Sequence, residues 1–161
     1  MNRIAVSGKA RSGKDEFAAV FCQTYPDATV ARFASRLYTI SAAVQRYFGA
    51  DIVKDPALMQ MLGDLLQREL GEDVFIRPVL ADIAAATGPV VVVDMRTTAE
   101  HAALTAAGFT TVRIERPGRP IDRDPTHLSE TALDNTPTDH IIYNTGSLAE
   151  YRENVAAMLL S

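Results

Sequence analysis

The 161-residue sequence has one cysteine, no tryptophan and no long apolar run. The lone Cys22 cannot form a disulfide within the chain, and its apolar neighbours predict a thiol packed in the core. No stretch approaches the roughly 18 apolar residues that a membrane-spanning helix needs. The first residues also carry no apolar segment of the kind that a secretion signal requires. These absences predict a cytoplasmic protein without a membrane partner.

An excess of positive charge is also missing. The formal net charge is −4 and the pI is near 5.3, which argues against a broad surface for nucleic-acid backbone. We therefore expect no nucleic-acid polymer among the partners. Small anions remain candidates, because a phosphate site needs only a local group of donors and cations. Four arginines do lie close together in the sequence: Arg113, Arg116, Arg119 and Arg123.

Composition and periodicity predict one α/β domain over residues 1–161. Hydrophobic residues make up 47% and charged residues 22%, as in ordinary globular proteins. β-rich runs alternate with helical ones, which predicts a parallel sheet with helices on both faces. The expected strands are 3–7, 28–33, 89–94, 110–115 and 140–144. The expected helices are 13–24, 35–48, 56–86 with a break near Gly71, 98–107 and 147–160.

A glycine-rich loop follows the first predicted strand. Residues 8–15, GKARSGKD, match the P-loop pattern G-x-x-x-x-G-K-[ST] except at the last position. A strand enters this loop and a helical pattern leaves it, so backbone N–H groups can face an anion at the positive end of a helix. The loop is therefore predicted to bind ATP, with Lys14 reaching the β- and γ-phosphates. The expected contacts are Gly8, Lys9, Ala10, Arg11, Ser12, Gly13, Lys14 and Asp15.

Asp15 stands where a hydroxyl normally holds Mg²⁺. A carboxylate is a good oxygen ligand for this ion, and its charge is favoured in the first turn of a helix. Lys9, Arg11 and Lys14 offset the extra negative charge beside the phosphates. Two interpretations stay open: Asp15 binds Mg²⁺ directly or through water, or it only caps the helix.

Two polar residues follow the third predicted strand. Ligands of parallel sheets bind beyond the carboxyl ends of the strands. Asp94 is therefore placed to hold Mg²⁺ or its water, or to position the acceptor, and a turn or cap carboxylate is the alternative. Arg96 is a candidate to grip the acceptor's phosphate with both prongs of its guanidinium, and a surface salt bridge is its alternative.

Two further segments are expected to close over the ligands. The helical insertion near 35–86 would cover the acceptor, with Arg36 and Arg77 as candidate contacts. Residues 116–137 hold four of the eight prolines and have weak periodicity, with a short helix expected at 127–134. We expect a lid near 116–126 that excludes water from the reaction. Its candidate catalytic residues, beside Lys14, are Arg116, Arg119 and Arg123.

Several stretches, in order along the chain, resemble the bacteriophage-type deoxynucleoside monophosphate kinases, a family of P-loop kinases. The loop at 8–15 has that family's G-x-x-x-x-G-K-D form. LLQRELGEDVFIR (65–77) is similar to its leucine-glutamine-x-x-glycine segment with a following arginine. Residues 90–118 are similar to its strand, aspartate-x-arginine turn, helix and next strand. HLSETALD (127–134) and YNTGSL (143–148) resemble its C-terminal signature.

This resemblance implies a three-layer P-loop NTPase fold of the nucleoside monophosphate kinase type, with a five-stranded parallel sheet. It implies an enzyme that uses ATP and Mg²⁺ to convert a dNMP into a dNDP, acting in the host cytoplasm if the gene belongs to a phage. It adds Gln67 to the substrate-binding residues and Asn144 to the ATP-binding residues. The sequence departs from the family pattern at Arg36 and Tyr38, where a lysine is common, and lacks the tryptophan often found after Arg77. It also has Asn144-Thr145-Gly146 in place of asparagine-aspartate-glycine.

Two other functions stay open at this point. One is a P-loop kinase for another small phosphorylated metabolite, because phosphomevalonate kinase of the animal type also resembles the loop and the HLSE segment at 127–130. The other is a nucleotide-binding protein without catalysis. The preferred base, the choice between ribose and deoxyribose, and the oligomeric state, a homodimer included, are not fixed by the sequence.

Overall fold

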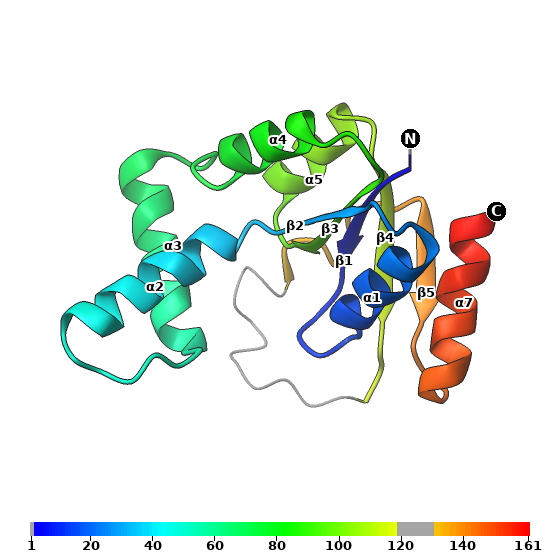
Figure 1. Cartoon of the computed structure of the whole chain (residues 1–161), viewed down its shortest axis with the longest axis horizontal. Coiled ribbons are helices and arrows are strands. Elements are labelled where there is room, and N and C mark those ends of the chain that lie inside the picture. The colour runs from blue at the N-terminus through cyan, green and yellow to red at the C-terminus, as the bar shows by residue number, and fades with distance from the viewer. Residues whose placement is uncertain (1, 119–130) are drawn as a thin grey trace.

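The structure is a computed structural model that describes residues 2–118 and 131–161. Its centre is one sheet of five parallel strands in the order β2–β3–β1–β4–β5 (Figure 1). The strands are β1 Arg3–Ser7, β2 Thr29–Ala31, β3 Val90–Met95, β4 Thr110–Glu115 and β5 His140–Tyr143. β1 pairs with β3 on one side and with β4 on the other, so the order in which strands are added to the sheet reverses at β1. The carboxyl end of β1 is therefore the point where such sheets bind ligands.

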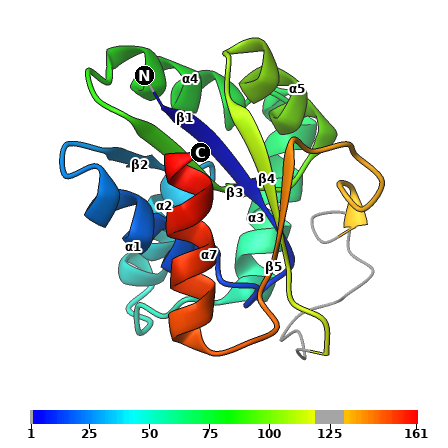
Figure 2. The same ribbon diagram turned by 90° about the vertical axis from the view of Figure 1, so that its right-hand side faces the viewer.

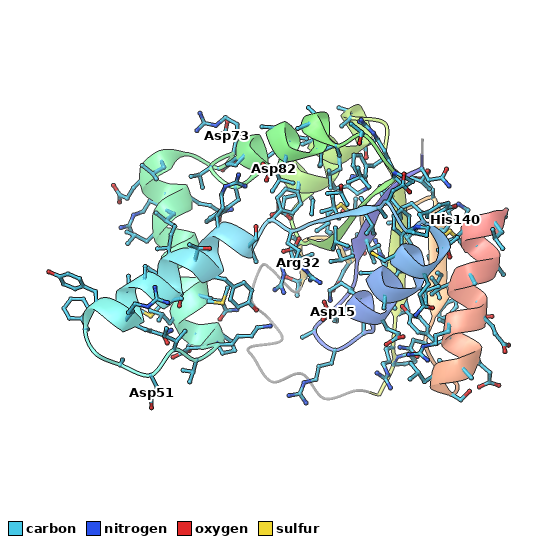
Figure 3. The ribbon with its side chains drawn as sticks, in the orientation of Figure 1. Asp15, Arg32, Asp51, Asp73, Asp82 and His140 are labelled. Atoms are coloured by element: carbon cyan, nitrogen blue, oxygen red, sulfur yellow. The ribbon has the colours of Figure 1, made fainter. Side chains whose placement is uncertain are left out.

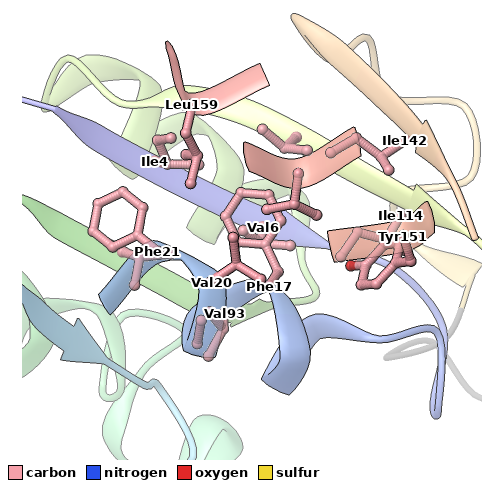
Figure 4. Packing of buried hydrophobic residues seen from close by; sticks show 14 residues of the cluster. Ile4, Val6, Phe17, Val20, Phe21, Val93, Ile114, Ile142, Tyr151 and Leu159 are labelled. Carbon is pink, nitrogen blue, oxygen red and sulfur yellow. The ribbon is translucent and has the colours of Figure 1, made fainter. Parts of the chain in front are cut away.

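Helices cover both faces of the sheet, as the alternation of strands and helices predicts (Figure 2). α1 (Lys14–Thr24) and α7 (Leu148–Leu160) pack on one face. α4 (Ile76–Ala85) and α5 (Thr98–Ala106) pack on the other. β3 is buried along its whole length and contributes alternate residues to the two cores. The core under α1 and α7 includes Phe17, Phe21, Val91, Val93 and Tyr151 (Figure 4).

Two helices extend away from the sheet: α2 (Ser35–Tyr47) and α3 (Pro56–Leu70), which pack against each other (Figure 1). α3 begins after Asp55, whose carboxylate accepts from the N–H groups of Ala57 at 2.9 Å and Leu58 at 3.1 Å. It ends at Gly71, with φ of 102°, which confirms the break expected there. The predicted insertion at 35–86 therefore divides in two, because α4 buries Ile76, Val79 and Ile83 against the sheet.

Most element boundaries agree with the sequence-based prediction to within a residue or two. The main difference is β2, which ends at Ala31 instead of residue 33. The N–H groups of Phe33 and Ala34 are bound to the carboxylate of Asp94, so this segment turns out of the sheet toward α2. Cys22 is only half-buried. The helix expected at 127–134 falls largely outside the described residues.

Candidate active site

The loop between β1 and α1 has a backbone shape that only glycine fits at two positions. Gly8 and Gly13 have φ of 144° and 114°. A Cβ at Gly8 would lie 2.6 Å from the carbonyl oxygen of Ile114, and one at Gly13 would lie 2.7 Å from Nδ2 of Asn144. Neither contact is tolerable, so both glycines are required for the close turn. Arg11 also has positive φ, at 61°.

Lys14 bends back across this loop. Its Nζ donates to the carbonyl oxygens of Gly8 at 2.6 Å and Lys9 at 2.7 Å. α1 begins at Lys14 without a side-chain cap on its N-terminal N–H groups. The buried Oγ of Ser12 has no hydrogen-bond partner among the described residues. An ammonium, helix N–H groups and an unsatisfied hydroxyl thus meet in one loop, and this donor set fits phosphate groups.

Two buried side chains support the loop from behind. Nδ2 of Asn144 donates to the carbonyl oxygen of Ser12 at 2.8 Å, and the Tyr151 hydroxyl donates to that of Gly13 at 3.0 Å. Burial raises the pKa of the Tyr151 phenol well above its usual range. Asn144, predicted to contact ATP, therefore holds the loop backbone here. Sequence reasoning did not single out Tyr151, because nothing in its local pattern distinguishes it from a core tyrosine.

Asp15 pairs with Arg32 across the site. Arg32 Nη2 lies 2.8 Å from Asp15 Oδ1, and Figure 3 shows the two side chains facing each other across the gap between α1 and the end of β2. The N-cap of α1 is Gly13, and no side chain caps this helix, so Asp15 does not have the capping role considered above. Its side chain is 85% exposed and open to a ligand. Arg32 was not predicted as a site residue.

Asp94 anchors the turn that leads into α2. Its Oδ1 and Oδ2 accept from the N–H groups of Phe33 and Ala34, each at 2.9 Å. Burial raises the pKa of this carboxyl, while these two N–H groups and the nearby Arg96 and Arg32 oppose the rise. Both oxygens therefore already have partners. Asp94 thus makes the contacts of a turn carboxylate, which is the alternative considered above. The turn that it holds lies between β2 and α2, however, and not after its own strand β3.

Glu100 fixes the backbone beside Asp94. Its Oε2 accepts from the N–H groups of Arg96 at 2.6 Å and Thr97 at 2.9 Å, and Thr97 Oγ1 accepts from the Glu100 N–H at 3.1 Å. This is a capping box at the start of α5. Burial raises the pKa of Glu100 to about 7, and the neighbouring Asp94 adds to the rise. The T-x-x-E spacing is a signal that sequence reasoning left unused.

A cleft opens between the sheet edge and the pair α2–α3. Asp94, Arg96 and Gln67, all predicted to bind substrate, line it together. The apolar and aromatic part of the lining comes from Phe33, Leu37, Tyr38, Met59 and Phe75. The polar residues come from the sheet edge and the start of α5, from α3 and from Lys54, whose Nζ lies 5.1 Å from the Tyr38 ring centroid. Such a lining is typical of small-molecule sites.

A smaller hollow lies on the loop side of the sheet edge. It is lined by Gly8 and Lys9 of the loop, by Arg113, and by Arg96. Arg96 thus lines both hollows, the one beside the phosphate loop and the one under α2 and α3. Arg96 therefore lies between the phosphate loop and the cleft.

Other predicted residues lie elsewhere. Arg36 pairs with Asp82 on α4, at 3.1 and 3.3 Å, and Arg77 pairs with Asp73 at 2.8 Å. Neither arginine is among the residues that line the cleft. Arg116 Nη1 donates to the carbonyl oxygen of Arg11 in the loop, at 3.3 Å. Arg119 and Arg123, and most of the predicted lid, lie outside the described residues.

Two findings concern the part of the chain that the structure describes. No group of three or more His, Cys, Asp or Glu side chains there is placed to hold a metal ion by itself. No helix there combines the length and the apolar character needed to cross a membrane.

Known proteins resemble this chain at the level of sequence and of fold. A family model described as deoxynucleotide monophosphate kinase matches residues 49–155, a range that begins after the phosphate loop. The uncharacterized protein ORF77 of Ictalurid herpesvirus 1 (strain Auburn) is 29% identical over 170 residues, covering 97% of this chain and 69% of that protein.

Solved structures share the fold at low identity. Shikimate kinase from Aquifex aeolicus aligns with a TM-score of 0.53 at 18% identity, covering 98% of this chain and 96% of that one. The tunicamycin resistance protein of Deinococcus radiodurans aligns with a TM-score of 0.52 at 17% identity, covering 98% and 95%. The fold is therefore that of the P-loop kinases, as predicted. Because the family model matches well over half of the sequence, the chain belongs to the deoxynucleotide monophosphate kinase family and is an ATP-dependent phosphotransferase with small nucleotides as substrates.

Proposed function

We propose that the enzyme transfers the γ-phosphate of ATP to a deoxynucleoside monophosphate that lies in the cleft under α2 and α3, giving a dNDP and ADP. The position of Arg96 carries this proposal, because this residue lines both the hollow beside the phosphate loop and the cleft. Phosphoryl transfer requires donor and acceptor in line, with cations at the transferred group. Arg96 would hold the acceptor's phosphate toward the loop.

On the donor side, the loop 8–15 would hold the triphosphate of ATP. Its N–H groups and the Ser12 hydroxyl would bind phosphate oxygens, and Lys14 would exchange its bonds to the Gly8 and Lys9 carbonyls for the β- and γ-phosphates. Asn144 and Tyr151 would keep the loop in shape during this exchange. Arg116 already contacts the loop and would add positive charge, as part of a lid near 116–126.

Asp15 is the residue best placed to hold Mg²⁺, directly or through water, because its carboxylate is exposed at the loop. Asp94 would contribute less, since both of its oxygens already accept hydrogen bonds from the backbone. Bound Mg²⁺ would supply neutralisation of the phosphate charge.

The lining of the cleft favours a nucleotide over the other phosphorylated acceptors that the sequence left open. The aromatic side chains of Phe33, Tyr38 and Phe75 offer flat apolar surface, which suits a nucleobase better than an aliphatic chain. The net charge of −4 supports small nucleotides over nucleic-acid polymers as partners.

The test is an assay of ADP release, coupled to NADH oxidation, across the four dNMPs and a set of small phosphorylated metabolites that includes phosphomevalonate. We expect turnover with at least one dNMP and none with the other metabolites. Lys14→Ala, prepared in parallel, controls for contaminating kinases. Activity confined to another metabolite, or absent with every acceptor despite ATP binding, would contradict the proposal.

A further inference from the structure

Two successive carbonyl groups at the end of the phosphate loop are held by buried side chains from the far end of the chain. The carbonyl oxygen of Ser12 accepts from Asn144 Nδ2 at 2.8 Å, and that of Gly13 accepts from the Tyr151 hydroxyl at 3.0 Å. Asn144 follows β5, Tyr151 lies in the first turn of α7, and both are buried. A Cβ at Gly13 would lie 2.7 Å from Asn144 Nδ2 and 3.2 Å from two ring carbons of Tyr151, so these two side chains enclose Gly13.

Holding a carbonyl also orients the N–H group of the following residue. A peptide group is planar and trans, so its C=O and its N–H point in opposite directions. The Ser12 carbonyl shares a peptide group with the Gly13 N–H, and the Gly13 carbonyl shares one with the Lys14 N–H. With both carbonyls directed at Asn144 and Tyr151, these two N–H groups are turned away from those side chains. They lie at the start of α1, where N–H groups favour an anion.

The two peptide groups differ in what else holds them. The Gly13 carbonyl also accepts from the Phe17 N–H at 3.0 Å, which is the bond that opens α1. The Ser12 carbonyl lies before the helix, and Asn144 holds it from outside. Burial and the neighbouring Glu16 raise the pKa of the Tyr151 phenol, so its hydroxyl keeps the proton that it donates.

We propose that Tyr151 and Asn144 are positioning residues for ATP, acting on its phosphates through the N–H groups of Lys14 and Gly13. This inference rests on the proposed function, in which loop 8–15 holds the triphosphate, and it adds that residues after β5 orient two of the loop's donors. Neither side chain has to contact the nucleotide, because each donates to the loop backbone. A change at either residue should therefore weaken phosphate binding and leave the acceptor site unaffected.

The first test uses Tyr151→Phe, which removes the hydroxyl and keeps the ring that packs in the core (Figure 4). The probe is inorganic tripolyphosphate, which carries the phosphates of ATP without the nucleoside. Calorimetric titration without Mg²⁺ or acceptor should show about fivefold weaker binding, because the Lys14 N–H loses its fixed direction. ATP should lose affinity by about the same factor, and the KM for the monophosphate should not change.

Tyr25→Phe is the matched control. The Tyr25 hydroxyl donates to the carbonyl oxygen of Leu159 at 2.9 Å, near the end of α7 and beyond the end of α1. Both variants thus lose a bond from a tyrosine to a backbone carbonyl, and Tm should fall by a few degrees in each. Only Tyr151→Phe should lose tripolyphosphate affinity. Unchanged affinity in Tyr151→Phe, or an equal loss in Tyr25→Phe, would overturn the inference.

The second test observes the Lys14 N–H directly. The chain has three lysines, so labelling with ¹⁵N-lysine gives three backbone amide signals, and the Lys14 signal is the one absent from Lys14→Ala. Saturating tripolyphosphate should move this amide proton downfield in the wild type and in Tyr25→Phe, because it bonds to an anion. The shift should be smaller in Tyr151→Phe, and a full shift there would contradict the role of the hydroxyl. Because neither test needs an acceptor or turnover, the inference can hold or fail whatever the ADP-release assay shows.

Discussion

The guanidinium of Arg32 lies 2.8 Å from the carboxylate of Asp15, so a cation from the end of β2 sits on the residue proposed to hold Mg²⁺. Arg32 also lowers the pKa of Asp94, although burial raises that pKa overall. The pair between Asp15 and Arg32 is exposed, and such pairs contribute little to stability, so either partner can be changed without unfolding the protein. The pair matters because the Arg32 guanidinium offsets the negative charge that Asp15 would offer to a metal ion.

Substitutions at the two residues should shift the Mg²⁺ requirement in opposite directions. Asp15→Asn should raise the Mg²⁺ concentration for half-maximal activity, because a neutral amide binds the ion less well. Arg32→Gln should lower it, because the carboxylate loses a competing cation. Titration of ADP release against Mg²⁺ at saturating nucleotides checks both, and ATP affinity with and without Mg²⁺ provides a readout independent of turnover. A shift in the same direction for both variants would contradict the competition.

Lys14→Ala should remove most of the turnover while leaving the fold intact. The Lys14 ammonium donates to the Gly8 and Lys9 carbonyls of the loop, so its loss is expected to affect the loop and not the core. We expect kcat to fall by about 100-fold or more, because the lost charge stabilises the transferring group. Arg152→Ala is the control, since Arg152 pairs with Glu16 of α1 at 2.6 Å and is not among the predicted site residues. An equal loss in both variants would point to a general effect of charge around α1 instead.

Arg96→Lys should raise the KM for the monophosphate and leave the KM for ATP nearly unchanged. Lysine keeps the charge but loses the planar, two-pronged contact that a guanidinium makes with a phosphate. Initial rates measured with each substrate varied in turn separate the two constants. Equal changes in both would show that Arg96 acts on the shared structure of the sheet edge.

Glu100 should make stability fall as pH rises. Its folded-state pKa of about 7 exceeds the ordinary value of 4.5, so the native protein binds the proton more tightly than the unfolded chain does. The contribution of protonated Glu100 to the free energy of unfolding is fully present below pH 4.5, and it is lost as the pH rises through about 7. Glu100→Gln lacks this titration, so its stability relative to the wild type should improve by roughly 2–3 kcal/mol between pH 5 and pH 8.

Urea unfolding of both proteins at the two pH values measures that difference. Glu150→Gln is a matched control, because Glu150 occupies the same position in the capping box of α7. Hydrogen bonds from Ser147 lower the pKa of Glu150, so its contribution is lost only below the ordinary pKa of a carboxyl group, and this variant should show no change over the same interval. A constant difference for Glu100→Gln would mean that Glu100 titrates normally.

The sequence predicted those parts of the site that depend on local pattern. The glycines of loop 8–15 and the strand that ends at Asp94 are local features, and their spacing alone determines the cradle and the sheet edge. Gln67, Asp94 and Arg96 meet in one cleft because strands and helices of known order bring them there.

Pairings between distant segments could not be read from the sequence. Arg32 approaches Asp15 only because β2 ends early, and it ends early because Asp94, 61 positions after Phe33, binds the Phe33 N–H. Arg36 was expected at the acceptor, yet its partner Asp82 lies on α4. Arg32 and Arg36 look alike in the sequence. Only the position of α4 on the sheet, which brings Asp82 to Arg36, distinguishes them.

Arg116→Ala and Arg113→Ala should affect different properties, although both arginines belong to the same basic segment. Arg113 donates to the carbonyl oxygens of Leu133 at 2.6 Å, Asp134 at 2.9 Å and Thr136, so it holds residues 133–136 in place. Its removal leaves these acceptors unpaired and should lower Tm by several degrees. Within the described residues, Arg116 makes a long hydrogen bond of 3.3 Å to the loop carbonyl of Arg11, and the loss of this bond should hardly change Tm.

For Arg116→Ala the loss should appear in catalysis, because its guanidinium lies against the loop that is proposed to bind ATP. We expect kcat to fall about tenfold, equivalent to about 1.4 kcal/mol of transition-state stabilisation, with a smaller change in ATP affinity. Steady-state kinetics and nucleotide titration of the two variants, beside their unfolding curves, separate these effects. Normal turnover in Arg116→Ala would remove this arginine from the proposed lid and leave it as part of the solvated surface.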